Sequence, residues 1–108
     1  MKIIDLKKGN KELIEQTAII LYESFKNISE AWPTMESALD EVHESIGEDR
    51  ISRVAVNDDR VVLGWIGGES MYNGNVWELH PLVVKREFRG QGIGKDLVND
   101  LEEKVRER

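Results

Sequence analysis

The residues best suited to chemistry lie between Val76 and Gly94, where the sequence reads VWELHPLVVKREFRGQGIG. Its last six residues contain three glycines, at positions 90, 92 and 94, directly before a segment with helical spacing. Glycines allow a backbone to approach a ligand closely, and the free N–H groups and positive dipole end of a helix N-terminus favour phosphate. Three such glycines alone are more typical of an ordinary loop, but their position before a helix predicts a phosphate-binding turn.

The run before this turn, Val76–Val84, has the composition of a strand but contains Pro81. Proline has no backbone N–H, so the hydrogen-bond ladder must be interrupted there, at a sheet edge or at a bulge. An interrupted strand beside a phosphate-binding turn is the arrangement expected of a pocket for a long, phosphorylated cofactor.

Two titratable side chains, Glu78 and His80, lie in the same run. Strand alternation places positions 76, 78, 80, 82 and 84 on one face, provided that no bulge intervenes. A carboxylate or an imidazole on that face could accept a proton and attract a cation. The alternative is a polar pair on a solvated face of the sheet.

Seven elements are predicted to position these residues. Apolar spacing predicts strands at 2–6, 53–57, 60–72 and 76–84, and helices at 11–25, 34–46 and from position 92 or 94 to 108. Asn73-Gly74 favours a hairpin turn, and the glycines at 64, 67 and 68 indicate a bulge or a close approach to the strand that contains them. We therefore expect one domain, residues 1–108, with an α+β fold in which helices pack on a mainly antiparallel sheet.

Composition limits the classes of function. The chain has 108 residues, of which 21 are acidic and 15 basic, giving a net charge of −6. This balance argues against a nucleic-acid partner and is compatible with a cationic substrate. No cysteine is present, which excludes disulfides and thiolate metal sites and fits a reducing cytoplasm. No segment has the length and apolar character of a membrane span, and no metal site is expected.

The stretch Arg89-Gly90-Gln91-Gly92-Ile93-Gly94 resembles the motif of the GNAT superfamily of acetyl-CoA-dependent N-acetyltransferases. That motif is glutamine or arginine, two residues of any type, glycine, any residue, and glycine or alanine. The order of the predicted elements also resembles the GNAT fold through its third main helix. The sequence WELHPLVV at 77–84, together with Trp32-Pro33, is similar to the bacterial aminoglycoside 6'-N-acetyltransferases. The resemblance covers essentially the whole chain, whereas the chain covers about two-thirds of such an enzyme.

The resemblance implies acetyl-CoA as the cofactor. The backbone of the glycine turn would hold the diphosphate through Arg89, Gly90, Gln91, Gly92, Ile93, Gly94 and Lys95. The pantetheine arm would lie beside Leu82, Val83 and Val84, and the amide of Leu82 would stabilise the oxyanion that develops from the thioester. Glu78 would act as the base for the attacking amine, directly or through water, with His80 as a second candidate.

Aromatic residues supply further candidates for the acceptor pocket. Tryptophan and tyrosine are more often core residues than substrate platforms, but Trp32 belongs to a loop that borders the acceptor pocket in this superfamily. We expect Trp32, Tyr72 and Glu78 to contact the acceptor. The acids around the second helix are expected to form a solvated face: Glu30, Glu36, Asp40, Glu41 and Glu44.

The final helix reaches Arg108 without a glycine cap or a proline stop. Basic residues near a helix C-terminus are favourable and fit a natural end, but together with the resemblance the pattern predicts a cut chain. Such a chain lacks the later strands and helix of the superfamily, and the tyrosine that usually protonates the leaving thiolate. The strand at 76–84 would then have an open edge that promotes association, and we expect a homodimer.

Two classes of function follow from these patterns. The first is an enzyme that transfers acetyl from acetyl-CoA to a primary amine of an aminoglycoside or a similar polycation. The second is a non-catalytic fragment that binds coenzyme A or associates through its open edge.

Overall fold

The computed structural model describes residues 1–27, 30–71 and 76–108, without the side chains of Leu79 and His80. Its elements, in chain order, are β1 (Lys2–Asp5), α1 (Lys11–Phe25), α2 (Met35–Glu44), β2 (Arg50–Val56), β3 (Val62–Met71), β4 (Val76–Val84), the 3-10 turn η2 (Arg86–Phe88) and α3 (Ile93–Arg106). The predicted order of helices and strands is confirmed.

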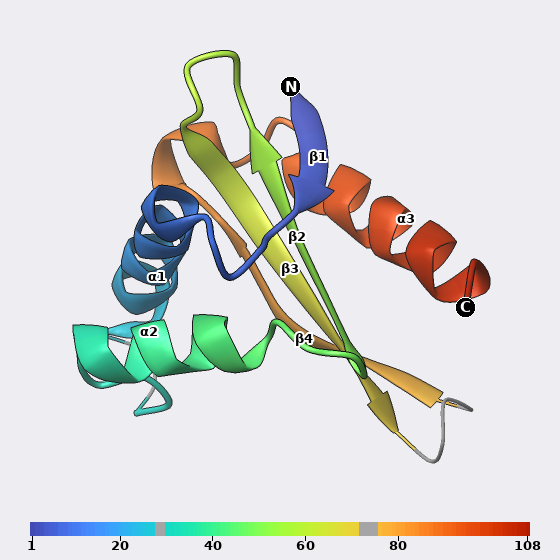
Figure 1. Cartoon of the computed structure of the whole chain (residues 1–108). Coiled ribbons are helices and arrows are strands. Elements are labelled where there is room, and N and C mark those ends of the chain that lie inside the picture. Colours follow the sequence, from blue (N-terminus) through green and yellow to red (C-terminus); the bar gives the residue numbers. More distant parts are fainter. Residues whose placement is uncertain (28–29, 72–75) are drawn as a thin grey trace.

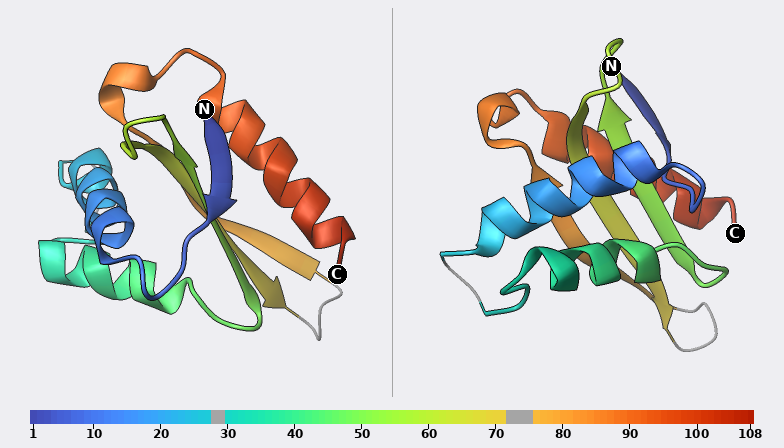
Figure 2. Two further views of the ribbon diagram at one scale, coloured as in Figure 1. Left: turned by 45° about the horizontal axis from the view of Figure 1, so that its top comes forward. Right: turned by 60° about the vertical axis from the view of Figure 1, so that its left-hand side comes forward.

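The sheet has the order β1-β2-β3-β4, and each neighbouring pair is antiparallel. Helices α1 and α2 cover one face of this sheet and α3 covers the other, which gives three layers (Figures 1 and 2). The α+β class and the mainly antiparallel sheet predicted from the sequence are therefore confirmed. Strand β4 forms one edge of the sheet as far as the chain is described.

Two apolar clusters hold the layers together, one on each face of the sheet. Val54 and Trp65 belong to the cluster beneath α1 and α2, whereas the adjacent residues Ala55 and Ile66 belong to the cluster beneath α3. This switch between neighbours follows from the two-residue period of a strand. The central strands β2 and β3 are consequently buried on both faces.

Several element boundaries differ from those predicted. Strand β2 begins at Arg50 rather than Arg53, because the first residues after the α2–β2 loop already pair with β3, beginning with Arg50 opposite Glu69. Helix α2 is shorter than the predicted 34–46 and is capped by Thr34, whose side chain accepts a hydrogen bond from the Ser37 N–H at 3.0 Å. The Ser37 hydroxyl in turn accepts from the Thr34 N–H at 3.1 Å, which completes a capping box.

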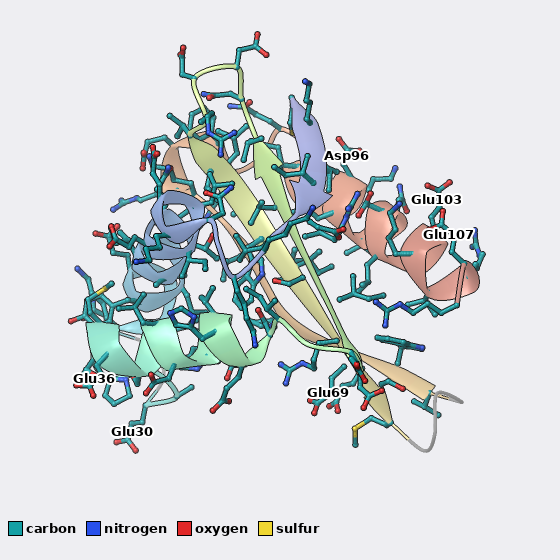
Figure 3. The ribbon with its side chains drawn as sticks, viewed as in Figure 1. Glu30, Glu36, Glu69, Asp96, Glu103 and Glu107 are labelled. Atoms are coloured by element: carbon teal, nitrogen blue, oxygen red, sulfur yellow. The ribbon has the colours of Figure 1, made fainter. Side chains whose placement is uncertain are left out.

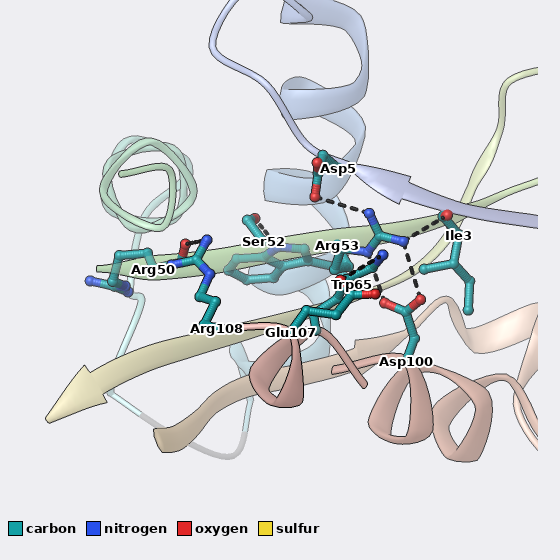
Figure 4. A network of polar contacts seen from close by, with 10 residues as sticks. Ile3, Asp5, Arg50, Ser52, Arg53, Trp65, Asp100, Glu107 and Arg108 are labelled. Atoms are coloured by element: carbon teal, nitrogen blue, oxygen red, sulfur yellow. Dashed lines mark hydrogen bonds and ion pairs between the residues drawn. The ribbon is translucent and has the colours of Figure 1, made fainter. Parts of the chain in front are cut away.

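A buried arginine ties the sheet to α3. The Nε of Arg53 donates to Asp100 at 2.8 Å, and its Nη1 donates to Asp5 at 2.9 Å (Figure 4). A third bond, from Nη2, reaches the carbonyl of Ile3 at 3.1 Å. Burial alone lowers the pKa of Arg53, but the hydrogen bonds and charges of Asp100 and Asp5 outweigh burial and raise that pKa above its ordinary value. The charged guanidinium therefore fixes α3 against β1 and β2.

Helix α3 packs closely on β3 because Gly64 and Gly68 of that strand have no side chain between the strand and the helix. A Cβ at Gly64 would lie 3.0 Å from both Leu97 Cδ1 and the Val83 carbonyl oxygen, and one at Gly68 would lie 2.9 Å from Leu101 Cδ1. The prediction that glycines in this strand mark a close approach is confirmed. This contact sets the position of the N-terminus of α3 relative to β4.

Candidate active site

The glycine turn leads from η2 into the first turn of α3. Gly90 and Gly92 have φ angles of 82° and 85°, in the left-handed region that side chains disfavour. Gly92 occupies the N-cap position and has no side chain to cap the helix, so the N–H groups of Ile93, Gly94 and Lys95 have no partner within the helix. These three donors and the helix dipole form an arrangement suited to an anionic group.

The space over this turn is open. A Cβ added at Gly90 or at Gly92 would meet no heavy atom within 4 Å. Gly90, Gln91, Gly92 and Lys95 are all exposed. A ligand can therefore reach the backbone of the turn from solvent.

The strand before the turn contains a β-bulge at Pro81. Ile66 of β3 lies opposite Leu82, but Gly68 lies opposite Leu79, so one residue of β3 faces two residues of β4. The interruption predicted from Pro81 is confirmed, and its physical reason is the missing N–H of that residue.

The bulge inverts the alternation of side chains along β4. Trp77, Leu82 and Val84 all pack against the cluster beneath α3, although Trp77 and Leu82 are an odd number of residues apart. Glu78 follows Trp77 directly and therefore lies on the opposite face, which is the face of α1 and α2. The placement of Glu78 on one face with Leu82 and Val84 depended on an uninterrupted strand and is wrong.

Beyond the bulge, backbone groups of β4 point to the open edge of the sheet. The Lys85 N–H donates to the Leu63 carbonyl at 2.7 Å, toward β3. Because successive residues in a strand direct their backbone groups to opposite sides, those of Val84 and Leu82 point away from β3. The Val84 carbonyl accepts a bond from Arg89 Nε at 3.0 Å on that side.

A groove of about 370 Å³ follows this edge. Its lining residues come from the end of α1, from β4 and from the glycine turn: Ser24, Phe25, Leu82, Val83, Val84 and Arg89. Arg89 spans the groove, since its Nη2 also donates to the Ser24 hydroxyl at 3.2 Å. The groove thus extends along the edge of β4 as far as Arg89, the residue before Gly90.

Glu78 is exposed and lies opposite Glu69 of β3. Two carboxylates in directly opposed positions repel each other, and a cation between them relieves that repulsion. Arg50 is 3.8 Å from Glu69, which offsets part of the negative charge. Glu69 lies near the far end of β3 in Figure 3. The Glu78–Glu69 pair therefore offers negative charge on the α1–α2 face.

Of the other residues predicted to contact the acceptor substrate, one lies beside the groove and one falls outside the described residues. Trp32 is half-buried, and its ring meets that of Phe25 edge to face with centroids 5.0 Å apart, so it lies next to the groove. Tyr72 falls outside the described residues, as does the side chain of His80. Ser24 and Phe25 also line the groove, although their spacing on α1 indicates only an apolar helix face.

The acidic residues around α2 are mostly solvated, as predicted. Glu30, Glu36, Asp40 and Glu44 are exposed, whereas Glu41 is half-buried. Figure 3 shows Glu30 and Glu36 on the outside of the molecule. The described His, Asp and Glu side chains do not gather in a group that could hold a metal ion. Within the same residues, no helix has both the length and the apolar character needed to cross a membrane.

Comparison with solved structures gives a consistent group of matches. A crystal structure of an aminoglycoside 6'-N-acetyltransferase complexed with coenzyme A superposes with a TM-score of 0.84 at 31% identity. The aminoglycoside 6'-N-acetyltransferase from Enterococcus faecium gives 0.81 at 36%, and an aminoglycoside 6'-acetyltransferase type Ii gives 0.82 at 35%. Each match covers 99% of this chain but only 56%, 55% and 65% of the respective structure. The chain therefore spans little more than half to about two-thirds of the length of these enzymes.

A comparison with curated proteins gave no match. A family profile, in contrast, matches residues 16–108 and is described as the acetyltransferase (GNAT) family. It covers α1 from residue 16 onward, β4 and the glycine turn, so the match includes the residues that line the groove. The chain belongs to the acetyltransferase (GNAT) family.

Proposed function

We propose that this chain carries the cofactor-binding and proton-accepting part of an N-acetyltransferase that transfers acetyl from acetyl-CoA to a primary amine. The observation that carries the proposal is the proximity of two sets of backbone groups, the free N–H groups at the start of α3 and the open edge of β4 beyond its bulge. A Cβ at Gly94 would lie 3.7 Å from Val84 Cγ2 and 4.0 Å from Leu82 Cδ2, so the start of α3 lies beside the end of β4. Similarity to three aminoglycoside acetyltransferases, one of them complexed with coenzyme A, supports the same function.

The residues present fit coenzyme A. The N–H groups of Gly92 to Lys95 would bind its diphosphate, assisted by the exposed Arg89 and Gln91. The outward backbone groups of Leu82 and Val84 would pair with the amides of the pantetheine arm, as a neighbouring strand does. In the structure the Val84 carbonyl already accepts a hydrogen bond from Arg89 Nε. Binding of the arm therefore requires Arg89 to release that carbonyl, which frees its guanidinium for the diphosphate.

Acetyl-CoA supplies an activated acetyl thioester to this groove. The Leu82 N–H would donate to the thioester oxygen as negative charge develops there, and one such donor in a low-dielectric site contributes about 3–4 kcal/mol. The amine nitrogen would form a bond to the carbonyl carbon while the C–S bond breaks, and coenzyme A would leave as its thiolate and take a proton from solvent. Glu78 would accept the proton lost by the amine, directly or through water, and His80 is a second candidate for that role.

The inverted alternation of β4 determines the side from which the amine arrives. Glu78 lies on the α1–α2 face, so the acceptor would approach the edge of β4 from that face and not from the α3 side. Glu78 and Glu69 supply negative charge there, and Trp32 borders the groove through Phe25. An acceptor with several ammonium groups, such as an aminoglycoside, suits this surface.

The role of Glu78 is tested by Glu78→Gln, with Glu102→Gln on the outer face of α3 as the matched control. Thiol release from acetyl-CoA is followed with an aminoglycoside that carries a 6'-amine. We expect Glu78→Gln to lower the turnover rate about 100-fold or more, the range for loss of a general base, and Glu102→Gln to leave it unchanged. Equal rates for the two variants would remove Glu78 from the mechanism.

The unpaired edge of β4 in the described sheet favours one alternative, a module that binds coenzyme A or another chain without catalysing transfer. Calorimetric titration with acetyl-CoA and light scattering separate these functions. Saturable heat with thiol release supports the transferase, and heat without release supports the module. We propose a cytoplasmic homodimer as the working form, for which light scattering should give twice the mass of one chain.

A further inference from the structure

A second cavity lies at the opposite end of α3 from the glycine turn. Its volume is about 470 Å³, and it is bounded by the end of β1, the loop after α2, the start of β2 and the end of α3. The 14 residues of α3, at about 1.5 Å per residue, separate this cavity from the turn by roughly 20 Å. We call it the β1–α3 cavity. It shares no lining residue with the groove at the edge of β4.

The charged lining of the β1–α3 cavity is predominantly basic. It comprises Lys7, Arg50, Lys104 and Arg108, with the carboxylates Asp5 and Glu107. Both carboxylates are already engaged. Asp5 accepts from Arg53 at 2.9 Å, and Glu107 lies 3.5 Å from Lys104. The lining therefore carries an excess of two positive charges in a chain whose net charge is −6.

Arg50 presents a polar group that lacks a protein partner. Its side chain is 17% exposed, and its Nε is buried with no hydrogen-bond acceptor among the described residues. Its ion pair with Glu69 is long, at 3.8 Å from Nη1. A buried N–H without an acceptor raises the free energy of the folded state, so an oxyanion that accepted a hydrogen bond from this nitrogen would stabilise the fold.

The wall next to Arg50 is held in place by Arg108. Arg108 Nη1 donates to the Glu48 carbonyl at 2.8 Å, and its guanidinium lies over the Trp77 ring at 5.3 Å. Figure 4 shows Arg108 beside the backbone of Arg50, with Glu107 next to Arg108 just after the end of α3. These contacts join the end of α3 to the start of β2, so the basic side chains are positioned before any ligand arrives.

We propose that the β1–α3 cavity is a binding site for a small phosphate-bearing anion. Phosphate near neutral pH carries close to two negative charges, which matches the excess on the lining. The planar guanidinium of Arg50 can donate from Nε and one Nη to two oxygens of the same phosphate. The volume lies within the range of small-molecule sites. Lys7 and Lys104 line the same cavity.

The test is a titration of the 15N-labelled chain with inorganic phosphate at constant ionic strength, with chloride as the reference anion. We expect saturable shifts of the Arg50 Nε–H signal and of amides around Gly47, with a dissociation constant of about 1 mM. Shifts of the amide signals of Gly92 to Lys95 report phosphate binding at the glycine turn separately from binding in the β1–α3 cavity. Phosphate shifts confined to that turn, or equal effects of phosphate and chloride at Arg50, would overturn the proposal.

A matched pair of exposed lysines provides the control. Lys7 lines the cavity, whereas its neighbour Lys8 does not. Lys7→Gln should weaken phosphate binding at Arg50 about threefold, and Lys8→Gln should leave it unchanged. Arg50→Lys keeps the charge but removes the bidentate guanidinium donor. This variant should bind phosphate more weakly than Lys7→Gln does. Equal affinities for the two lysine variants would contradict the site, and circular dichroism verifies that each variant is folded.

Discussion

Two glycines at the start of α3, Gly92 at its N-cap and Gly94 in its first turn, are expected to respond to alanine in opposite ways. Gly92 has a φ of 85°, and a methyl group added there would meet no heavy atom within 4 Å, so the whole cost of Gly92→Ala lies in the backbone. A left-handed conformation costs a non-glycine residue about 1–2 kcal/mol. Gly94 lies inside the helix, and its Cβ would make an ordinary contact at 3.7 Å with Val84 Cγ2. Gly94→Ala should therefore stabilise the fold by about 0.5–1 kcal/mol.

The two variants differ by a methyl group at positions two residues apart, so each controls for the other. Urea unfolding followed by tryptophan fluorescence should separate their midpoints by about 1 M, with the wild type between them. Acetyl-CoA affinity should fall for Gly92→Ala, because the displaced backbone no longer presents its N–H groups to the diphosphate. A Gly92→Ala variant as stable as Gly94→Ala would refute the assignment of a left-handed N-cap.

Two further predictions concern the contacts that position α3. Gly64→Ala should lower the free energy of unfolding by about 1–3 kcal/mol, because its methyl group meets the Val83 carbonyl oxygen at 3.0 Å and backbone cannot yield. Gly68→Ala should cost less, because the atom that its methyl group would crowd, at 2.9 Å, is the flexible end of Leu101, and its contact with Trp77 at 3.6 Å is of ordinary length. The reverse order in urea unfolding would contradict the packing described. Asp100→Asn should cost about 1–3 kcal/mol, since it removes one of the two carboxylates that pair with Arg53. Glu102→Gln, which removes a surface pair at 3.9 Å, should change thermal unfolding little, and equal losses for the two would count against the Arg53 network.

The order of elements was predictable because each segment has a clear period or a clear interruption. The boundaries of α1 agree with the spacing of its apolar residues. The start of β2 could not be predicted from the apolar pattern, because its first residues are ordered by pairing with β3. The local sequence predicts whether an element is a helix or a strand better than it predicts where that element begins and ends, because pairing with other strands decides the ends.

The site was predictable where it depends on backbone chemistry. Pro81 cannot donate a hydrogen bond, and Gly92 adopts a conformation that other residues disfavour, so the bulge and the turn follow from residue type. The face that carries Glu78 was not predictable from alternation, because the position and size of a bulge decide it. The groove contacts of Ser24 with Arg89 join segments far apart in sequence, and no local pattern indicates them.

The central claim is that backbone donors at the start of α3 and at the open edge of β4 bind one coenzyme A molecule. The most direct measurement is an amide-resolved NMR titration with coenzyme A, ADP and pantetheine. Coenzyme A should shift the amides of Gly92 to Lys95 together with those of Leu82 and Val84. ADP should shift only the first group, and pantetheine only the second. Saturation by coenzyme A with the amides of Gly92 to Lys95 unmoved would contradict the account.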